Sequence, residues 1–301
     1  MNALMKPTSA LRKVGRKATL DALSTKARLN GEIEEAWSLP RVHFLYLHAV
    51  PAQEMDSFRR LVQRVAATHR VVSHSEAVRL VQEGPIDHPI ASFSFDDGFA
   101  SNLQVGRILA EHGISGMFYI PTGFVDTSST AAARRFFGFT RGCDEVAMTW
   151  GDLEELLTLG HEIGNHTVTH RTVAELTPAE ATEEVYSAAE LLRRRLGASE
   201  HFAWPNGRWE HFTSRAAKDV FAAGHVSAAS ATRGAHTVRH EGPPESLCIR
   251  REHLMTEWPD AHMDYFIARS ARLSTVTDNR WPEVYHSSTL EGATPAPLPT
   301  T

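Results

Sequence analysis

The stretch IASFSFDDG at residues 90–98 combines a strand pattern with two adjacent carboxylates and a turn. Ser92, Ser94 and Asp96 share one face of this strand, and the apolar residues between them share the other, because successive side chains of a strand point to opposite faces. Asp96 is therefore expected to project at the carboxyl end of the strand, and Gly98 permits a tight turn after the acids. Taken alone, the acids and the glycine also fit a plain turn, in which Asp and Gly are common.

A second polar motif, HTVTH at residues 166–170, changes this interpretation. It follows an apolar strand pattern and a turn of small residues, so that both imidazoles could be directed at one point. Two histidines and one carboxylate are enough for a mononuclear metal site, and a second carboxylate beside them could act as a base. Together, the two motifs indicate a metal-dependent hydrolase.

Strand and helix patterns alternate on both sides of these motifs. The apolar spacing predicts strands at residues 42–48, 70–72, 90–95, 115–120 and 161–164, and helices at residues 55–68, 75–82, 102–112 and 150–159, with a further helix between Thr177 and Gly197. This order predicts an α/β fold with a parallel sheet or barrel. Active-site residues of parallel barrels lie at the carboxyl ends of the strands, where the two motifs are expected.

The two ends of the chain lack this alternation. Residues 1–41 are rich in Lys and Arg but contain no apolar run long enough for a signal peptide or a spanning helix, which predicts a cytoplasmic protein. A helix over residues 11–29 could rest on the anionic inner face of a membrane, although a solvated or frayed arm is the favoured interpretation. We expect a basic arm over residues 1–41, one catalytic barrel over 42–270 and a C-terminal extension over 271–301 that is flexible from about residue 287.

The composition is that of an ordinary globular protein. The 301 residues are 42% hydrophobic and 22% charged, with a formal net charge of -5, so there is no basic footprint for nucleic acid. Cys143 and Cys248 are too few to crosslink a chain of this size. Nucleic acid is therefore excluded as an expected partner.

Four stretches resemble motifs of one enzyme family. SFDDG at residues 94–98 and HTVTH at residues 166–170 resemble the first two motifs of the polysaccharide deacetylases, also called NodB-homology enzymes. YLHAV at residues 46–50 and FAWPNGR at residues 202–208 resemble two further motifs, and the similarity spans residues 42–255. The resemblance implies a distorted (β/α) barrel of about seven strands.

The resemblance also implies roles for the polar residues. Asp97, His166 and His170 would hold a divalent metal ion, with Zn²⁺ preferred, and Asp96 would be the general base. The chemistry of these groups agrees, because two imidazoles and one carboxylate leave a coordination position open for water. A cation on Asp97 would also keep both adjacent acids ionised.

The chain departs from the family pattern at two points. The family's arginine that orients the catalytic base is replaced by Ala203. The late Leu-x-His-Asp segment, whose histidine protonates the leaving amine, is also missing. The strand pattern SLCIRREH at residues 246–253 is nearest in order, so Arg250, Arg251 or His253 could occupy that region.

The remaining site residues are less closely defined. His253 and His236 are the candidate acids. The turn Trp204-Pro205-Asn206 could form a wall of the sugar groove, since aromatic faces suit pyranose rings, but Trp204 fits a core position equally well. His48 at the end of the first strand is expected to be structural.

The predicted function is hydrolysis of the non-peptide carbon–nitrogen bond of an N-acetyl or other N-acyl group on an amino sugar. The carbohydrate would belong to a glycan or glycan precursor of surface-polysaccharide biosynthesis, reached from the cytoplasm. Two alternatives remain open at this point: a non-catalytic glycan-binding barrel, and a hydrolase of a non-sugar amide or O-ester that uses the same site.

Overall fold

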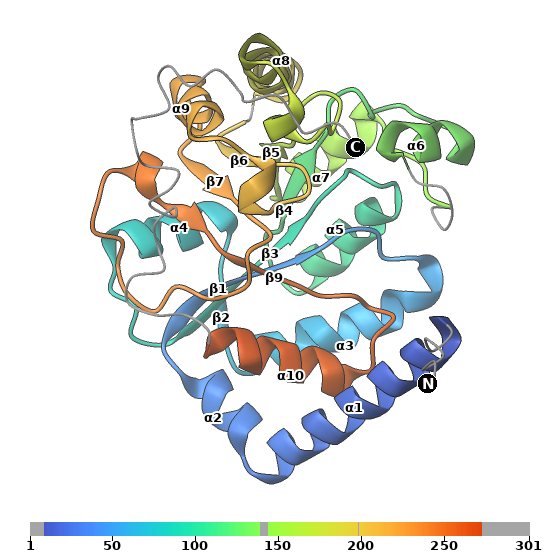
Figure 1. Ribbon diagram of the computed structural model, residues 1–301, viewed down its shortest axis with the longest axis vertical. Coiled ribbons are helices and arrows are strands. Elements are labelled where there is room, and N and C mark those ends of the chain that lie inside the picture. The colour runs from blue at the N-terminus through green and yellow to red at the C-terminus, as the bar shows by residue number, and fades with distance from the viewer. Residues whose placement is uncertain (1–8, 139–143, 198, 273–301) are drawn as a thin grey trace, which may run out of the picture.

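The computed structural model describes residues 9–138, 144–197 and 199–272 (Figure 1). A nine-stranded sheet has the order β8-β7-β6-β5-β4-β3-β1-β9, with β2 pairing to β3, and the neighbouring strands are parallel. The strands are β1 (Arg41–Leu47), β2 (Arg70–Val71), β3 (Pro89–Phe95), β4 (Met117–Ile120), β5 (Glu162–Asn165), β6 (His201–Ala203), β7 (Ser227–Ala229), β8 (Cys248–Ile249) and β9 (Arg251–His253). The predicted α/β architecture is confirmed. The sheet exceeds seven strands because it also includes the two-residue strand β2, and because residues 248–253 form two short strands, β8 and β9.

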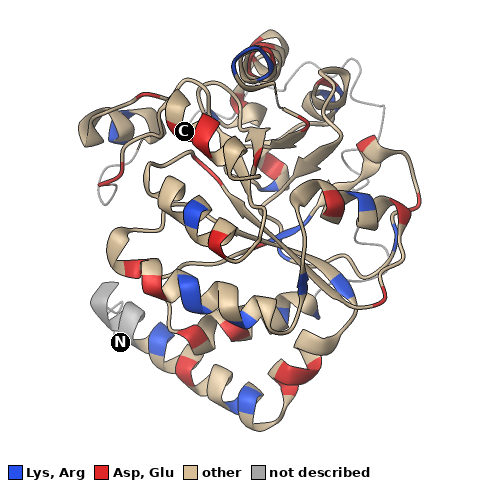
Figure 2. Cartoon of the chain, turned by 180° about the vertical axis from the view of Figure 1, so that it is seen from behind, with Lys and Arg blue, Asp and Glu red and all other residues tan. Residues whose placement is uncertain are grey.

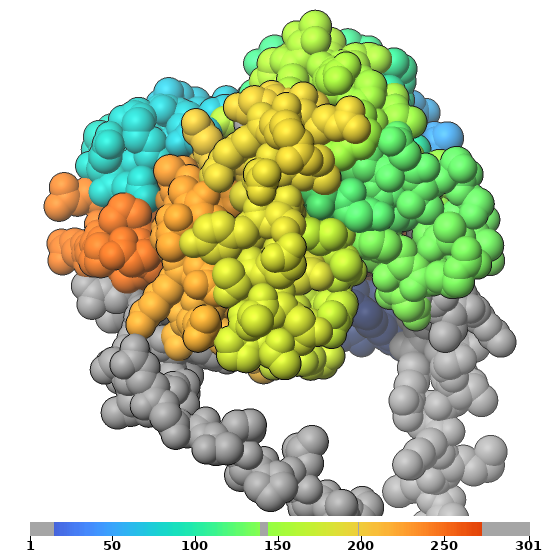
Figure 3. Space-filling view, turned by 90° about the horizontal axis from the view of Figure 1, so that it is seen from above, coloured from blue at the N-terminus to red at the C-terminus, as the bar shows by residue number. Residues whose placement is uncertain are grey.

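Helices surround this sheet. They are α1 (Ser9–Leu29), α2 (Glu32–Ser38), α3 (Met55–Ala66), α4 (His74–Glu83), α5 (Ser101–Glu111), α6 (Thr130–Phe137), α7 (Trp150–Thr158), α8 (Pro178–Leu196), α9 (Ser214–Ala222) and α10 (Asp260–Ala271). Seen from above, α4 and the segment around residues 235–250 lie on one side, and α6 lies on the opposite side (Figure 3). In α8, the predicted capping box of Thr177 and Glu180 is present, and Gly197 ends the helix with φ 70°.

The two edge strands of the sheet, β8 and β9, are consecutive in the sequence. β8 ends at Ile249 and β9 begins at Arg251, so that a single residue joins the strands at opposite ends of the strand order. Two consecutive Cα spacings reach only about 7 Å, so the sheet must curl until its edges approach each other. This curling places β9 beside β1, where Phe44 pairs with Arg251 and Tyr46 with His253.

The strand alternation separates an apolar outer face from an inner face that is polar only towards its carboxyl edge. Leu45, Phe93 and Phe95 belong to the large outer cluster that packs against the helices. Tyr46 and Ser94 are paired across β1 and β3. They alternate with these apolar residues along the strands, so they face the inside of the curled sheet. Because paired residues of parallel strands share a face, the inner side carries polar side chains near the carboxyl edge and an apolar cluster with Val42, Phe44 and Ile90 nearer the amino ends of the strands.

The N-terminal segment differs from the expected frayed arm. Residues 9–29 form α1, and Ser24 and Ala27 are buried, with Leu20 partly buried on the same face. This spacing of four and three residues gives a helix one packing face, which contacts α10. The frayed-arm interpretation is therefore wrong for this segment, whereas residues 1–8 and the predicted tail from residue 287 lie outside the described ranges.

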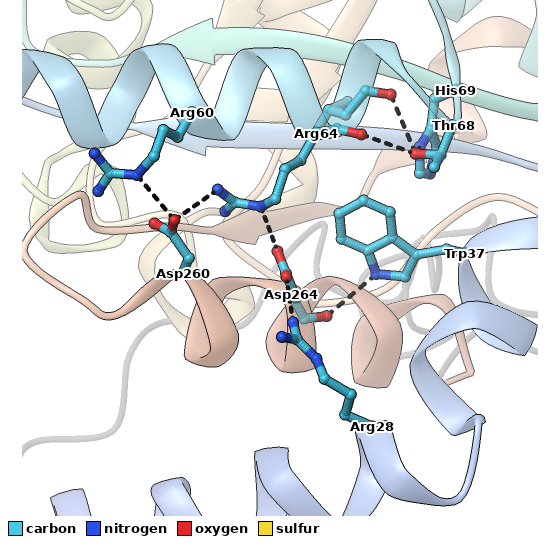
Figure 4. Close-up of polar contacts among 9 residues, drawn as sticks. Arg28, Trp37, Arg60, Arg64, Thr68, His69, Asp260 and Asp264 are labelled. Atoms are coloured by element: carbon cyan, nitrogen blue, oxygen red, sulfur yellow. Dashed lines mark hydrogen bonds and ion pairs between the residues drawn. The ribbon is translucent and has the colours of Figure 1, made fainter.

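A polar network fixes α1 and α10 to the body (Figure 4). The carboxylate of Asp264 accepts hydrogen bonds from Arg64 of α3 and Arg28 of α1, both at 2.9 Å. The indole N–H of Trp37 donates to the backbone oxygen of Asp264 at 3.2 Å. Asp260, one turn earlier in α10, accepts from Arg60 at 2.9 Å. The C-terminal helix thus connects three helices from the first part of the chain.

Charged residues of both signs alternate over the helices (Figure 2). The basic residues of α1 are followed by Glu32, Glu34 and Glu35 in the first turn of α2. None of the helices in the described ranges is long and apolar enough to cross a membrane.

Candidate metal centre and active site

Asp96 and Asp97 follow β3 directly, at the carboxyl edge of the sheet. The backbone turns there, because Asp97 has φ 75° and Gly98 has φ 66°. Positive φ is uncommon for residues other than glycine, although Asp tolerates it better than most. The turn lets these two adjacent carboxylates, both buried, meet different partners.

The second motif forms a loop directly after β5. Thr167 has φ 67° and His170 has φ 57°, so the segment is a compact loop and not a helix. The side-chain oxygen of Asn165 accepts the backbone N–H of Thr167 at 2.8 Å, and the Thr167 hydroxyl accepts that of His170 at 3.2 Å. Local side-chain bonds of this kind stabilise backbone conformations that would otherwise be strained.

Glu184 of α8 holds the same loop from outside. Its buried carboxylate accepts the backbone N–H groups of Val168 and Thr169, each at 2.8 Å, and also contacts the Thr169 hydroxyl. Charge-assisted hydrogen bonds of this kind are about twice as strong as neutral ones. The position of His170 therefore depends on an α8 residue that the sequence motif did not indicate.

The structure brings Asp97, His166 and His170 together. One potential ligand atom from each lies within 4.8 Å of the other two. Oδ1 of Asp97 is 3.0 Å from Nε2 of His170 and 3.5 Å from Nε2 of His166.

These three residues fit a divalent ion. Despite the short distances, neither contact has hydrogen-bond geometry, and Oδ1 of Asp97 is a buried oxygen without a donor among the described residues. Such an oxygen is costly unless a cation or a donor compensates it. Two imidazoles and one carboxylate are also the donor set of an open, catalytic type of metal site.

A second contact orients His166 for this role. Its Nδ1 lies 2.6 Å from the carbonyl oxygen of Ala203, which can only accept, so Nδ1 carries the proton. The lone pair of Nε2 then faces Asp97. Ligand histidines commonly have a partner of this kind on the other ring nitrogen.

Asp96 binds a different group, the guanidinium of Arg251. Nη1 and Nη2 of Arg251 donate to the two carboxylate oxygens of Asp96, each at 2.8 Å. Arg251 also donates from Nε to the backbone oxygen of Ser230 at 2.7 Å, and it lies 4.3 Å from the ring centre of Tyr46. Burial would raise the pKa of Asp96, but the charge of Arg251 lowers it below its ordinary value. Asp96 is thereby kept ionised and in one orientation.

Arg251 therefore contacts Asp96, the expected base, in this chain, in which Ala203 replaces the arginine expected from the resemblance. The sequence did not decide whether Arg250, Arg251 or His253 occupies the region of the missing late motif. Arg250 instead donates to the backbone oxygen of Arg233 at 3.1 Å, away from the carboxylates. Arg250 precedes β9, while Arg251 and His253 share the inner face of β9, where Arg251 is bonded to Asp96.

His48 is the imidazole that faces the site, in contrast to the structural role expected for it. It borders the same cavity as Asp96, Asp97 and both loop histidines. His253 lies behind it, with Nε2 at 3.1 Å from Nδ1 of His48, and does not border that cavity.

His236 lies elsewhere. It pairs with Val42 at the start of β1, the end opposite to the carboxyl edge. It is completely buried, and its Nε2 accepts the backbone N–H of Arg250 at 3.0 Å. The structure thus separates His236 from the carboxylates, so its expected role as an acid does not fit.

The turn after β6 divides into core and cavity residues. Trp204 is 0% exposed, stacks on Phe212 with ring centres 4.8 Å apart and donates to the Arg208 backbone oxygen. Its ring is therefore packed in the core, although the residue also borders the cavity over the site. Asn206 borders the cavity, whereas Pro205 does not.

The cavity over the site has a volume of about 1340 Å³. Besides the residues above, Phe136 and Phe137 of α6 line one wall, and Arg171 lies on the rim. The ring of Phe137 packs edge-on against His170 with centres 4.9 Å apart. The volume is sufficient for a sugar chain of more than one residue, because ligand pockets typically measure about 300–1000 Å³.

Comparison with known proteins identifies relatives. Residues 83–224 match the family model for polysaccharide deacetylase. An uncharacterized protein of Streptomyces coelicolor is 26% identical over 170 residues, which cover 56% of this chain and 53% of that protein. The chain thus spans about half the length of this curated relative.

Two solved structures share the fold. The Streptococcus pyogenes deacetylase PplD, in complex with acetate, has a TM-score of 0.56 and 13% identity, covering 78% of this chain and 98% of that one. IcaB from Ammonifex degensii has a TM-score of 0.56 and 18% identity, covering 77% and 97%. At these identities the similarity concerns the architecture.

Proposed function

We propose that the chain, which matches the family model for polysaccharide deacetylase over residues 83–224, is a hydrolase of non-peptide carbon–nitrogen bonds that removes N-acetyl or other N-acyl groups from an amino sugar. One observation carries the proposal. Within one cavity, an uncompensated Asp97 oxygen faces two imidazoles, while Asp96 is held ionised beside it by Arg251.

A divalent ion held by Asp97, His166 and His170 would polarise the acyl carbonyl and lower the pKa of a water molecule. We favour Zn²⁺ because of the two imidazole donors. Asp96 accepts the proton of the attacking water, and Arg251 keeps that carboxylate fixed and charged beforehand. His48 donates a proton to the amine nitrogen as the carbon–nitrogen bond breaks. The products are a carboxylic acid and a free sugar amine.

The non-catalytic alternative loses its support. It was suggested by Ala203 in place of an arginine and by the missing late histidine. Arg251 contacts the base in this structure, and His48 lines the cavity, so both functions have a residue available. A catalytic site is therefore the better interpretation.

Acetate release from N-acetylated oligosaccharides tests the proposal. The metal-loaded protein should release acetate, and a chelator should abolish the release reversibly. Asp96→Asn should retain the ion but lose about 10²–10⁴-fold in kcat, whereas His170→Ala should lose the ion, as measured by metal content. A panel with formyl amides, O-acetyl esters and non-sugar amides identifies the bond hydrolysed. Binding of both an ion and a glycan without any acyl release would refute the proposal.

We also propose a place for this reaction in surface-polysaccharide biosynthesis. The substrate would be a lipid-linked or nucleotide-linked amino sugar at the cytoplasmic side of the membrane, with α1 as a peripheral contact. The basic composition of α1 supports this contact. Cell fractionation, together with assays on both kinds of precursor, tests the location and the substrate separately.

A further inference from the structure

Two cavities of the structure meet at His48. The large cavity over the carboxylates is bordered by His48 on one side. A second cavity of about 210 Å³ is bordered by His48 and His253 together, and its lining includes the exposed Glu257. His253 belongs to the second cavity alone. The two imidazoles therefore lie between the site and a separate opening towards solvent.

The geometry of this histidine pair is defined on several sides. Nδ1 of His48 is 3.1 Å from Nε2 of His253, and the rings are perpendicular at 89° with centres 4.9 Å apart. The ring of Tyr46 packs on His253 at 4.8 Å and on His48 at 5.6 Å. The ring of Trp258 packs edge-on near His253, with ring centres 6.4 Å apart. With Nδ1 of His48 occupied by His253, Nε2 is the nitrogen left for a substrate.

We propose that His253 is a proton relay that resupplies His48 from the second cavity during each turnover. The inference rests on the proposed function, because it takes His48 as the donor to the leaving amine. It assigns a task to a histidine that touches neither the carboxylates nor the substrate cavity, so that His253 is a positioning and relay residue.

The protons balance in this scheme. As the carbon–nitrogen bond breaks, Nε2–H of His48 transfers its proton to the amine nitrogen. Nδ1 of His48 takes a proton from Nε2–H of His253, and Nδ1 of His253 takes one from a water or buffer acid in the second cavity, so that both rings end protonated on Nδ1. The starting tautomers return when Nε2 of His48 takes up a proton from the large cavity and the pair passes one proton back to the second cavity. The proton that Asp96 accepted from water returns to solvent as the acid product leaves. The sum is one water consumed and one amide hydrolysed.

The surroundings keep His253 neutral between turnovers. Burial and the neighbouring His48 lower the pKa of His253 to about 3, with a small opposing effect from Asp96. The cations Arg233 and Arg251 also lower it. A neutral imidazole has one donor and one acceptor nitrogen, which a relay requires.

Substitution of His253 distinguishes a relay from a structural contact. Glutamine can hydrogen-bond to His48 but cannot pass a proton on. His253→Gln should therefore lower kcat by about 10²-fold, the lower limit for lost acid–base catalysis, with KM and bound metal unchanged. Retention of wild-type kcat in His253→Gln would overturn the relay.

Chemical rescue provides the second measurement. His253→Ala leaves a space beside a cavity, and added imidazole should restore kcat at least about tenfold in a saturable manner. The double variant with His48→Gln should show no rescue, because the relay then lacks its last member. Wild type and the surface variant His112→Gln, measured at the same imidazole concentrations, correct for binding of imidazole at the metal. Absence of rescue in His253→Ala would also contradict the relay.

The wild-type assay separates this inference from the proposed function. If the wild type releases no acyl group from any substrate, the proposed function fails. If the wild type is active and His48→Gln is equally active, the donor assignment and the relay fail while the deacetylase proposal stands.

Discussion

Asp96 and Asp97 are neighbours in the chain, but their side chains have different partners. The turn at Asp97 directs its carboxylate to two imidazoles, whereas Asp96 continues the inner face of β3 and meets Arg251. Two adjacent acids would otherwise repel each other and raise each other's pKa. Separate partners, the guanidinium of Arg251 for Asp96 and the proposed metal ion for Asp97, would allow both to be ionised, which their different proposed roles require.

Removal of Arg251 should change the pH dependence of the reaction. The pKa of Asp96 is lowered in the folded protein, so its base form persists above that lowered pKa and is lost as the pH falls through it. Without the guanidinium, burial is left to raise the pKa. In Arg251→Met the acidic limb of kcat/KM should move to higher pH by about 1–3 units.

The neighbouring arginine serves as the control. Arg250→Met removes the same charge one residue earlier, just before β9, where the side chain donates to the backbone oxygen of Arg233. Its acidic limb should match that of the wild type. Equal profiles for Arg251→Met and the wild type would exclude an effect of Arg251 on the base.

Helix α8 acts on the site as an element, through Glu184. Its carboxylate accepts backbone N–H groups of the loop at residues 166–170 and so fixes a segment with two residues at positive φ. In Glu184→Gln the ionised acceptor is lost, and the loop should hold His170 less firmly. Metal affinity should fall by about 10–100-fold, the usual effect of removing an outer partner of a metal site. Competition with a chromophoric chelator measures it.

The preceding residue offers a matched control. Glu183 lies on the exposed side of α8, where it contacts Ser187. Glu183→Gln makes the same chemical change in the same helix turn and should leave metal affinity unaltered. Similar losses in both variants would assign the effect to general destabilisation of α8.

At the scale of the whole molecule, α10 connects the N-terminal helices to the sheet. Asp264 is 7% exposed and binds both Arg64 and Arg28, while Asp260 is 35% exposed. Asp264→Ala leaves Arg64 without its buried acceptor, so the free energy of unfolding should fall by about 1–3 kcal/mol. Asp260→Ala should cost less because its pairs are more exposed. Denaturant titration of both variants measures the difference, and the reverse ranking would disprove this account.

Much of the site could be predicted because its parts are local. The alternation of residues 90–95 places Asp96 at a strand end, and the spacing of His166 and His170 requires only one loop. The capping box of α8 and the strand–helix order likewise depend on residues close in sequence. The helical, packed state of α1 could not be predicted, because its stability comes from contacts with α10 more than 230 residues away.

The sequence by itself determined the parallel α/β order through its periodicity, and the resemblance of two short motifs implied the three proposed metal-site residues and the proposed base beside them. Only the tertiary structure decided which arginine and which histidines complete the site. Arg251 lies 155 residues from Asp96, and His253 lies 205 residues from His48. Their contacts exist because the sheet curls and pairs β9 with β1 in one register, and that register depends on the packing of the whole chain.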